Sequence, residues 1–313
     1  MGFISGIFGY LLNWLYEVFS NYGVAILIFS VILRVILIPI TIKQQKSMKK
    51  SAELQAEMSE IQKKYRNNPE KLNQETIDLY KREKMSPFSG CLTSILQLII
   101  ILSVFWLVSQ PLTYMKKTDN NLIDAYTTEM KESGYNSNNS YVQIATIDYA
   151  ETKYQEISKQ LEQENVENRE ELVKKQQEYN QLRLNMEFLG IDLSKVPTQN
   201  LNDWRVYVIP VLYVITSIIS TKLTTATQKK KQKKDIVVTA DGDSKEVDPT
   251  EQMQQMSNSM MYMIPVMSVM IAIIAPLGLA LYWLASNILM IIERLIINKV
   301  MEKDDNKEES SNG

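Results

Sequence analysis

Residues 22–43 read YGVAILIFSVILRVILIPITIK, an apolar run interrupted by Arg34 and Pro39. A helix needs about 20 mostly apolar residues to cross the hydrocarbon core of a bilayer, so this run is long enough to span it. Arg34 lies 11 residues after Gly23 and nine before Lys43, about 16 Å and 13 Å from the two edges at 1.5 Å per residue. The run therefore predicts a membrane-spanning helix with a charge near its middle.

Four more apolar stretches follow along the chain, and the last two meet at the tight-turn sequence Ala-Pro-Leu-Gly (residues 275–278). The five predicted spans are 21–42, 88–109, 204–222, 259–275 and 277–297. Blocks of this length without strand-like alternation favour helices. We therefore expect an all-α polytopic membrane protein with five transmembrane helices.

The average composition conceals these blocks and excludes several kinds of chemistry. The 313 residues are 45% hydrophobic and 22% charged, with a net charge of -2 and a mean hydropathy of -0.17. There is no His and only one Cys, Cys91, which excludes His-dependent catalysis, an internal disulfide and Cys-rich metal clusters. No phosphate-binding loop is visible. We expect no enzymatic activity, no cofactor and no metal site, and the net charge gives no general attraction to nucleic acid.

The charged segments between the spans predict the topology. Residues 43–84 carry 11 Lys and Arg, and residues 222–256 carry seven Lys. In a five-span arrangement both segments lie on the same side as the C-terminus, and the positive-inside rule makes that side cytoplasmic. The N-terminus and residues 110–203, with 16 acids and 10 bases between 111 and 203, are then outside the cell membrane.

Two further segments have helical patterns. Residues 1–20 are apolar and aromatic, which favours an interfacial helix, although a poorly ordered apolar end is the alternative. Residues 43–86 have the pattern of a cytoplasmic helical hairpin, broken at Asn67 and Asn68, with Asn68 as N-cap and Pro69 as first residue of the return helix. A simple solvated connector is the alternative.

The external insert, residues 110–203, is predicted to be an extended helical segment. Residues 116–140 are rich in Asn, Thr and Ser, with a short helix expected at 122–130. Residues 148–186 have a helical composition, with a turn between two helices near Asn165 and Asn168. After the last span we expect a disordered cytoplasmic tail, residues 298–313.

Basic residues in the two cytoplasmic segments are candidates for partner contacts. Those of the hairpin are Lys46, Lys49, Lys50, Lys63, Lys64 and Arg66. Those of the basic and acidic loop, residues 223–258, are Lys229, Lys230, Lys231, Lys233 and Lys234. The loop residues are candidates for contact with the ribosome, the one nucleic-acid-containing partner we expect. The alternative is that they serve only topology and attraction to anionic lipid.

Arg34 points to function, because an Arg at mid-bilayer costs about 2.5–3.5 kcal/mol on insertion scales. The sequence offers it no obvious acidic partner: Glu17 lies outside the span, and Glu293 lies near the inner end of the fifth. A water-filled, positively charged groove among the helices would accommodate it. Snorkelling, or bonding to backbone carbonyls, is the alternative. The polar residues that could line the groove are Ser30, Thr93, Gln97, Ser103, Thr216, Ser217, Ser268, Ser286 and Asn287.

Four motifs together resemble the YidC-type membrane protein insertase family in its Gram-positive-like form. They are NYGVAILIFSVILRVILIPI (21–40), GCLTSILQ (90–97), FLGIDLSKVP (188–197) and PLGLALYWLASN (276–287). The resemblance implies five helices around a hydrophilic groove open to the cytoplasm, and a cytoplasmic helical hairpin. It also implies that Arg34 is the groove arginine, Gln97 a polar groove position, and Tyr282 and Trp283 an aromatic pair.

The resemblance implies a membrane protein insertase or chaperone acting on nascent or small membrane proteins, alone or with the Sec translocon. Hydrophilic ends would pass through the groove, and apolar segments would leave it for lipid. Two alternatives remain open from the residues: a secondary transporter, and an envelope scaffold that acts through its external coil.

Overall fold

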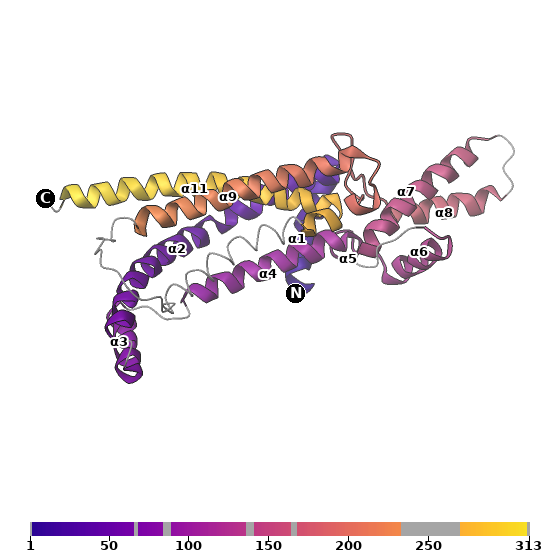
Figure 1. Cartoon of the computed structure of the whole chain (residues 1–313). Helices are drawn as coiled ribbons and strands as arrows, with labels where there is room; N and C mark the ends of the chain where they lie inside the picture. The colour runs from indigo at the N-terminus through magenta and orange to yellow at the C-terminus, as the bar shows by residue number, and fades with distance from the viewer. Residues whose placement is uncertain are drawn as a thin grey trace. The chain divides into compact units, whose positions relative to one another are not determined.

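The computed structural model describes residues 2–65, 68–83, 89–135, 141–163, 168–232 and 270–311, and the chain divides into two compact units. Unit 1 comprises Met1–Leu33, Ile99–Ile215 and Ser268–Asn287; unit 2 comprises Arg34–Leu98, Thr216–Met267 and Ile288–Gly313. Figure 1 labels the elements. The long helices α2 (Tyr22–Lys64), α4 (Ser89–Ser109), α9 (Val208–Gln232) and α11 (Leu277–Ser311) each contribute to both units.

Within the described residues, three helical segments are long and apolar enough to cross a membrane: Tyr22–Ser47, Trp204–Leu223 and Leu277–Ile297. A shorter apolar helical segment, Leu98–Ser109, forms the second half of α4. The predicted first, third and fifth spans are thus matched by apolar helices. Most of the predicted fourth span, 259–275, lies outside the described residues, so the number of five spans stays a prediction.

Helix α1 (Gly2–Phe19) confirms a helix in the first 20 residues, and the alternative of a poorly ordered end is wrong. Its inner face places Gly9 against the backbone of α5 (Pro111–Tyr114) and lets the Ser5 hydroxyl donate to the Ser103 carbonyl of α4, at 2.9 Å. Its outer face exposes aromatic side chains, among them Trp14. Such a face suits contact with lipid.

The described part of the insert, residues 110–203, includes three longer helices: α6 (Asn120–Glu132), α7 (Val142–Leu161) and α8 (Arg169–Leu182). Helices α7 and α8 lie side by side (Figure 1), which confirms the predicted helical pair and the turn near Asn168, a left-handed residue with φ 61°. The α6 prediction is also confirmed. Tyr126, Tyr149 and Tyr179 pack together and hold the three helices.

After α8, residues 183–207 return to the ends of two long helices. Strands β1 (Glu187–Phe188) and β2 (Ile191–Asp192) form an antiparallel hairpin, followed by the short helices η2 (Pro197–Gln199) and η3 (Trp204–Tyr207). The Asn185 carbonyl accepts from Tyr22 N at 2.9 Å, and the Leu193 carbonyl accepts from Gly278 N at 2.9 Å. The return segment thereby supplies acceptors that the first turns of α2 and α11 lack.

In unit 2, the second half of α2 and helix α3 (Pro69–Arg82) form the predicted hairpin. The Asn68 side chain caps α3 by accepting from Lys71 N at 3.1 Å, and Pro69 is the first helical residue, as predicted. Among the side chains that the structure describes in this pair, Leu54 and Leu79 are buried and apolar. The hairpin is therefore a folded element, and the simple-connector alternative is wrong.

Two helices extend further than the sequence suggested. Helix α9 continues to Gln232, so the first ten residues of the predicted loop 223–258 are helical. Helix α11 continues to Ser311, so the backbone of the predicted tail, residues 298–313, is helical as far as Ser311. The physical reason is local: neither extension contains Gly or Pro, and Lys, Gln, Met and Glu are good helix formers.

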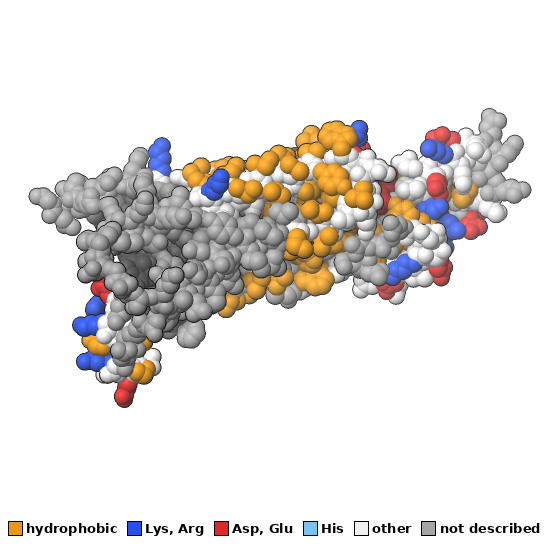
Figure 2. Space-filling model, viewed as in Figure 1, with side chains coloured by type: hydrophobic (Ala, Val, Ile, Leu, Met, Phe, Trp, Pro, Cys, Tyr) orange, Lys and Arg blue, Asp and Glu red, His pale blue; other side chains and the backbone are white. Residues whose placement is uncertain are grey.

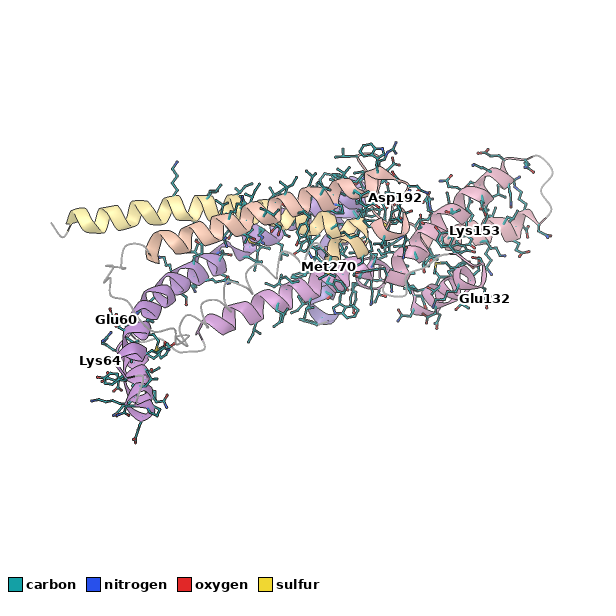
Figure 3. The ribbon with its side chains drawn as sticks, in the orientation of Figure 1. Glu60, Lys64, Glu132, Lys153, Asp192 and Met270 are labelled. Carbon is teal, nitrogen blue, oxygen red and sulfur yellow. The ribbon has the colours of Figure 1, made fainter. Side chains whose placement is uncertain are left out.

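Surface chemistry distinguishes the membrane helices from the insert. On the face shown in Figure 2, apolar side chains gather over α9, where Val211, Leu212 and Ile215 are exposed. The insert helices instead present charged side chains, such as Glu132 and Lys153 in Figure 3. Exposed apolar residues along a helix are expected where the solvent is lipid.

Candidate functional site

The intramembrane arginine is paired in the structure. In unit 2, Arg34 Nη1 of α2 lies 3.4 Å from Glu293 Oε2 of α11, and the two side chains are only 16% and 9% exposed. The expectation that Arg34 lacks an acidic partner is therefore wrong. The two helices bring together residues that are 259 positions apart, a register that no periodicity within either helix reveals.

The other oxygen of this carboxylate is also informative. Glu293 Oε1 is buried, and no group in the described part of the chain makes a hydrogen bond to it. An ionised carboxylate away from bulk water ordinarily has its acceptor sites filled. Glu293 therefore has one oxygen on Arg34 and one that can accept a further donor, such as water or a polar group of a bound chain.

The structure places the other predicted groove residues unevenly. Ser30 is buried and donates to the Ile26 carbonyl at 2.7 Å, which satisfies its hydroxyl within α2. Tyr282 is buried, Asn287 is half-buried, and the Trp283 ring lies 6.1 Å from that of Tyr213. The side chains of Thr93 and Gln97 lie outside the described residues.

The hairpin uses some of its charges internally. Lys50 Nζ donates to the Glu83 carbonyl at 2.7 Å, and Arg82 forms an ion pair with Glu57 across the two helices. This pair raises the pKa of Arg82 through hydrogen bonds to Glu57 and Glu83. Lys64, labelled in Figure 3, is exposed, as is Lys46. Lys50 is thus one predicted partner-contact residue that already has a structural role.

Several predicted contact residues cannot be placed by their side chains. This holds for Lys49, Lys63 and Arg66 of the hairpin, and for the basic run 229–234. Lys229, Lys230 and Lys231 lie in the last turns of α9 by their backbone, whereas Lys233 and Lys234 lie outside the described residues. Their partner contacts stay predictions.

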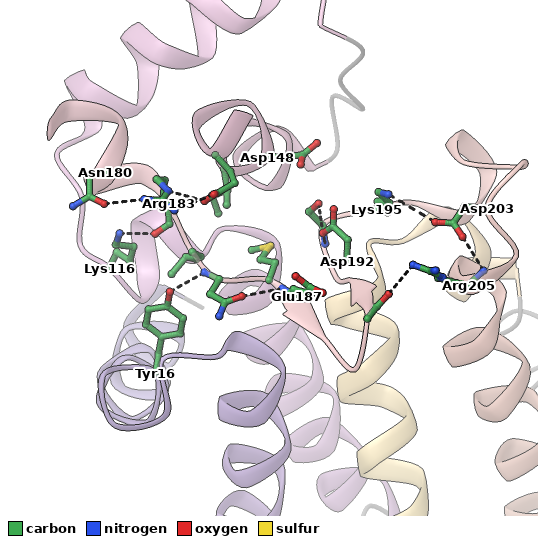
Figure 4. Close-up of a pocket in the computed structure, with 17 residues that line it drawn as sticks. Tyr16, Lys116, Asp148, Asn180, Arg183, Glu187, Asp192, Lys195, Asp203 and Arg205 are labelled. Carbon is green, nitrogen blue, oxygen red and sulfur yellow. Dashed lines mark hydrogen bonds and ion pairs between the residues drawn. The ribbon is translucent and has the colours of Figure 1, made fainter. Parts of the chain in front are cut away.

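Sequence reasoning missed a cavity of about 760 Å³ in unit 1, built by the insert and the return segment. Figure 4 shows its charged lining, which includes four bases and several acids from separate elements. The bases are Lys116, Arg183, Lys195 and Arg205. These four residues are spread along the sequence between positions 116 and 205, so no local motif marks them as one site.

The basic residues of this cavity differ in how they are compensated. Arg183 donates to Glu151 through Nε at 2.6 Å and through Nη2 at 2.9 Å. Burial acts to raise the pKa of Glu151, but the hydrogen bonds from Arg183 and Gln155 outweigh it and lower that pKa. Lys195 lies 3.8 Å from Asp203. These bases have acidic partners.

Lys116 has a different environment. Its Nζ donates to the Arg183 carbonyl at 2.8 Å, and it forms no ion pair with an acid of the described residues. Burial, with a smaller contribution from the Arg183 charge, lowers the pKa of Lys116 to about 8. It is a partly buried cation at the cavity wall, and none of the acids that line the cavity forms an ion pair with it.

Comparison with known proteins identifies similar chains. Residues 14–305 match the model of a family described as 60Kd inner membrane protein. The "Membrane protein insertase YidC" of Treponema denticola is 25% identical over 92% of this chain and 36% of its own length. The protein of the same name from Caldanaerobacter subterraneus is 44% identical over 34% of this chain and 51% of its own length.

A third relative shows the same pattern. The "Membrane protein insertase YidC" of Fusobacterium nucleatum is 40% identical over 31% of this chain and 47% of its own length. The chain thus spans about half, or less, of the curated relatives it matches. The family match and the three apolar helices together indicate a bacterial membrane protein.

Proposed function

Because this chain belongs to the 60Kd inner membrane protein family, the family of its YidC relatives, we propose that it is a membrane protein insertase. Its substrates are nascent or small membrane proteins with short hydrophilic ends. The observation that carries the proposal is the Arg34–Glu293 pair, a charged site held between two apolar helices.

The physical problem for an insertase is desolvation. A hydrophilic segment cannot cross about 30 Å of hydrocarbon without losing its hydration. A polar groove open to the cytoplasm shortens the unhydrated path. Five spans around such a groove, lined also by Thr93, Gln97 and Asn287, constitute the proposed architecture.

Arg34 exchanges its contact with the Glu293 carboxylate for a contact with a carboxylate of the substrate. An acidic residue of the substrate replaces Glu293 on the guanidinium, so Arg34 keeps a counter-charge throughout and no isolated cation is created in the membrane. The displaced Glu293 can accept donors from the substrate backbone or from water. The apolar segment of the substrate then passes along the outer faces of α9 and α11 into lipid, driven by hydrophobic burial.

The proposed topology places the C-terminus and the hairpin in the cytoplasm and the N-terminus outside. The basic segments, residues 43–84 and 222–256, support it through the positive-inside rule. Anionic lipid is the proposed partner of the basic run 229–234, which also offers a contact for the ribosome. Cooperation with the Sec translocon is a further part of the proposal.

Reconstitution tests this function directly. Purified protein in liposomes receives a short single-span substrate with two acidic residues in its translocated end, and protection of that end from added protease is scored. Protection should require the protein and should not require a nucleotide. Equal protection in protein-free liposomes, or uptake of a labelled solute without insertion, would contradict the proposal.

A further inference from the structure

The cavity of unit 1 has the properties of a binding site rather than a packing defect. Its volume of about 760 Å³ lies within the range of about 300–1,000 Å³ of ligand pockets. Residues from α1, α7, α8 and the return segment reach it, as Figure 4 shows for Tyr16, Asp148 and Asp192. The Tyr16 hydroxyl of α1 accepts from Asn185 N of the return segment at 2.8 Å, which holds these two parts of the lining together.

Lys116 is the uncompensated group of this cavity. Its neighbour Arg183 is held by both oxygens of Glu151, whereas Lys116 forms no ion pair with that carboxylate. Within the described residues, the hydrogen bond of the ammonium goes to a neutral carbonyl, that of Arg183. A partly buried cation in this state gains most from an anion that enters the cavity, because a charge-assisted hydrogen bond then replaces an unpaired charge.

The rest of the lining indicates what kind of anion fits. Glu187, Asp192 and Asp203 line the same cavity and would repel a compact dianion such as a phosphate group. Lys195 and Arg205 hold their partners at 3.8 Å and 3.5 Å, distances that leave donors available to a ligand. A lining of both signs complements a polypeptide segment, which carries an occasional carboxylate among neutral donors and acceptors.

We propose that this cavity binds an acidic segment of an extruded polypeptide, with Lys116 as the residue that receives its carboxylate. The source of that polypeptide, a translocated end of a substrate, rests on the proposed function, whereas the binding chemistry does not. The insert would then retain the acidic end after it has passed the membrane.

The test uses the 313-residue chain in nanodiscs of zwitterionic lipid. Two fluorescent peptides are compared that differ only in having Glu or Gln at one position. The Glu peptide should bind the unaltered protein about tenfold or more tightly than the Gln peptide, as expected for one charge-assisted hydrogen bond. Lys116→Gln should abolish this difference. The matched control is Lys117→Gln, since the neighbouring Lys117 lies over the Tyr10 ring at 4.7 Å and does not line the cavity.

A second measurement needs no variant. Acylation of Lys116 by an amine-selective reagent at pH 8, read by mass spectrometry, should slow when the Glu peptide is present and not when the Gln peptide is. Equal binding of both peptides to the unaltered protein would overturn the proposal. So would protection by inorganic phosphate, or by phosphatidylglycerol in the nanodisc, without protection by the Glu peptide. Peptide binding is measured without insertion. If the protein binds the Glu peptide but does not insert substrates, the proposed function is contradicted and the binding site is not.

Discussion

The Arg34 guanidinium lies 3.4 Å from the Glu293 carboxylate, although 259 positions separate the two residues in the chain. Arg34 is therefore one half of a buried ion pair and not a single charge among apolar helices. Such pairs contribute little net stability, but removal of one partner costs about 3–5 kcal/mol because the other charge is left buried. Stability and function can therefore be separated by variants.

Arg34→Ala should lower the thermal midpoint in detergent and reduce insertion of a substrate with an acidic end about tenfold or more, the worth of one charge-assisted hydrogen bond. Arg34→Ala/Glu293→Gln should recover much of the midpoint, since no charge is left unpaired, without recovering insertion. The protease-protection assay with acidic and neutral substrate ends measures the second effect. Full insertion by the double variant would show that Arg34 acts only through folding.

Glu293→Gln removes the charge of the carboxylate that lies against Arg34. If substrate and Glu293 compete for the guanidinium, this variant should insert acidic-ended substrates at least as fast as the unaltered protein, despite a lower thermal midpoint. Initial rates with acidic and neutral ends give the comparison. A loss of insertion equal for both ends would argue against the exchange.

Gly9→Ala tests the packing of α1 on α5. A methyl group at Gly9 would lie 1.8 Å from the Tyr114 carbonyl oxygen, so the two backbones must separate, at a cost of about 1–3 kcal/mol. Thermal stability in detergent should fall. Gly6→Ala is the matched control, because its methyl group meets only Lys117 Nζ at 3.5 Å and Ala favours a helix by about 1 kcal/mol. Equal loss in both variants would contradict the close approach.

Asn68→Ala removes the side chain that caps α3, which should cost about 1 kcal/mol. Hydrogen exchange of the first turn of α3, followed by mass spectrometry, should become faster. Asn73→Ala changes the same residue type at an exposed interior position of the helix and should leave exchange in that turn nearly unchanged. No difference between the two variants would mean that the cap contributes nothing.

The lowered pKa of Lys116 predicts a pH dependence. Its ordinary pKa is 10.5 and its folded value is about 8, so between these values the unfolded chain binds more protons and stability rises with pH. The gain should be about 1 kcal/mol between pH 8 and 9. Near-ultraviolet circular dichroism of the tyrosine cluster during thermal unfolding measures it, below the pH at which tyrosines ionise. Lys116→Gln should remove this rise of stability with pH. If the rise persists in the variant, another group causes it.

Local patterns predicted much of the helical structure. Asn68 and Pro69 have the residue types of a helix start, and the α7–α8 pair followed from helical composition and the Asn-rich turn. Such features depend on neighbours within one or two turns, which is why they can be read from the chain. Hydropathy places the ends of α9 and α11 too early, because apolar residues give way to charged ones before the helices end and no helix breaker is present.

The amino-acid sequence alone determined that the chain has apolar helices with an arginine near the middle of one of them, because length and hydropathy are local properties. Its motifs also pointed to the family that the comparison established. The tertiary structure alone decided that Glu293 faces Arg34 and that Lys116 lies beside an already paired Arg183. Partners of a charge depend on the register of helices remote in sequence, and that register is set by packing across the whole fold.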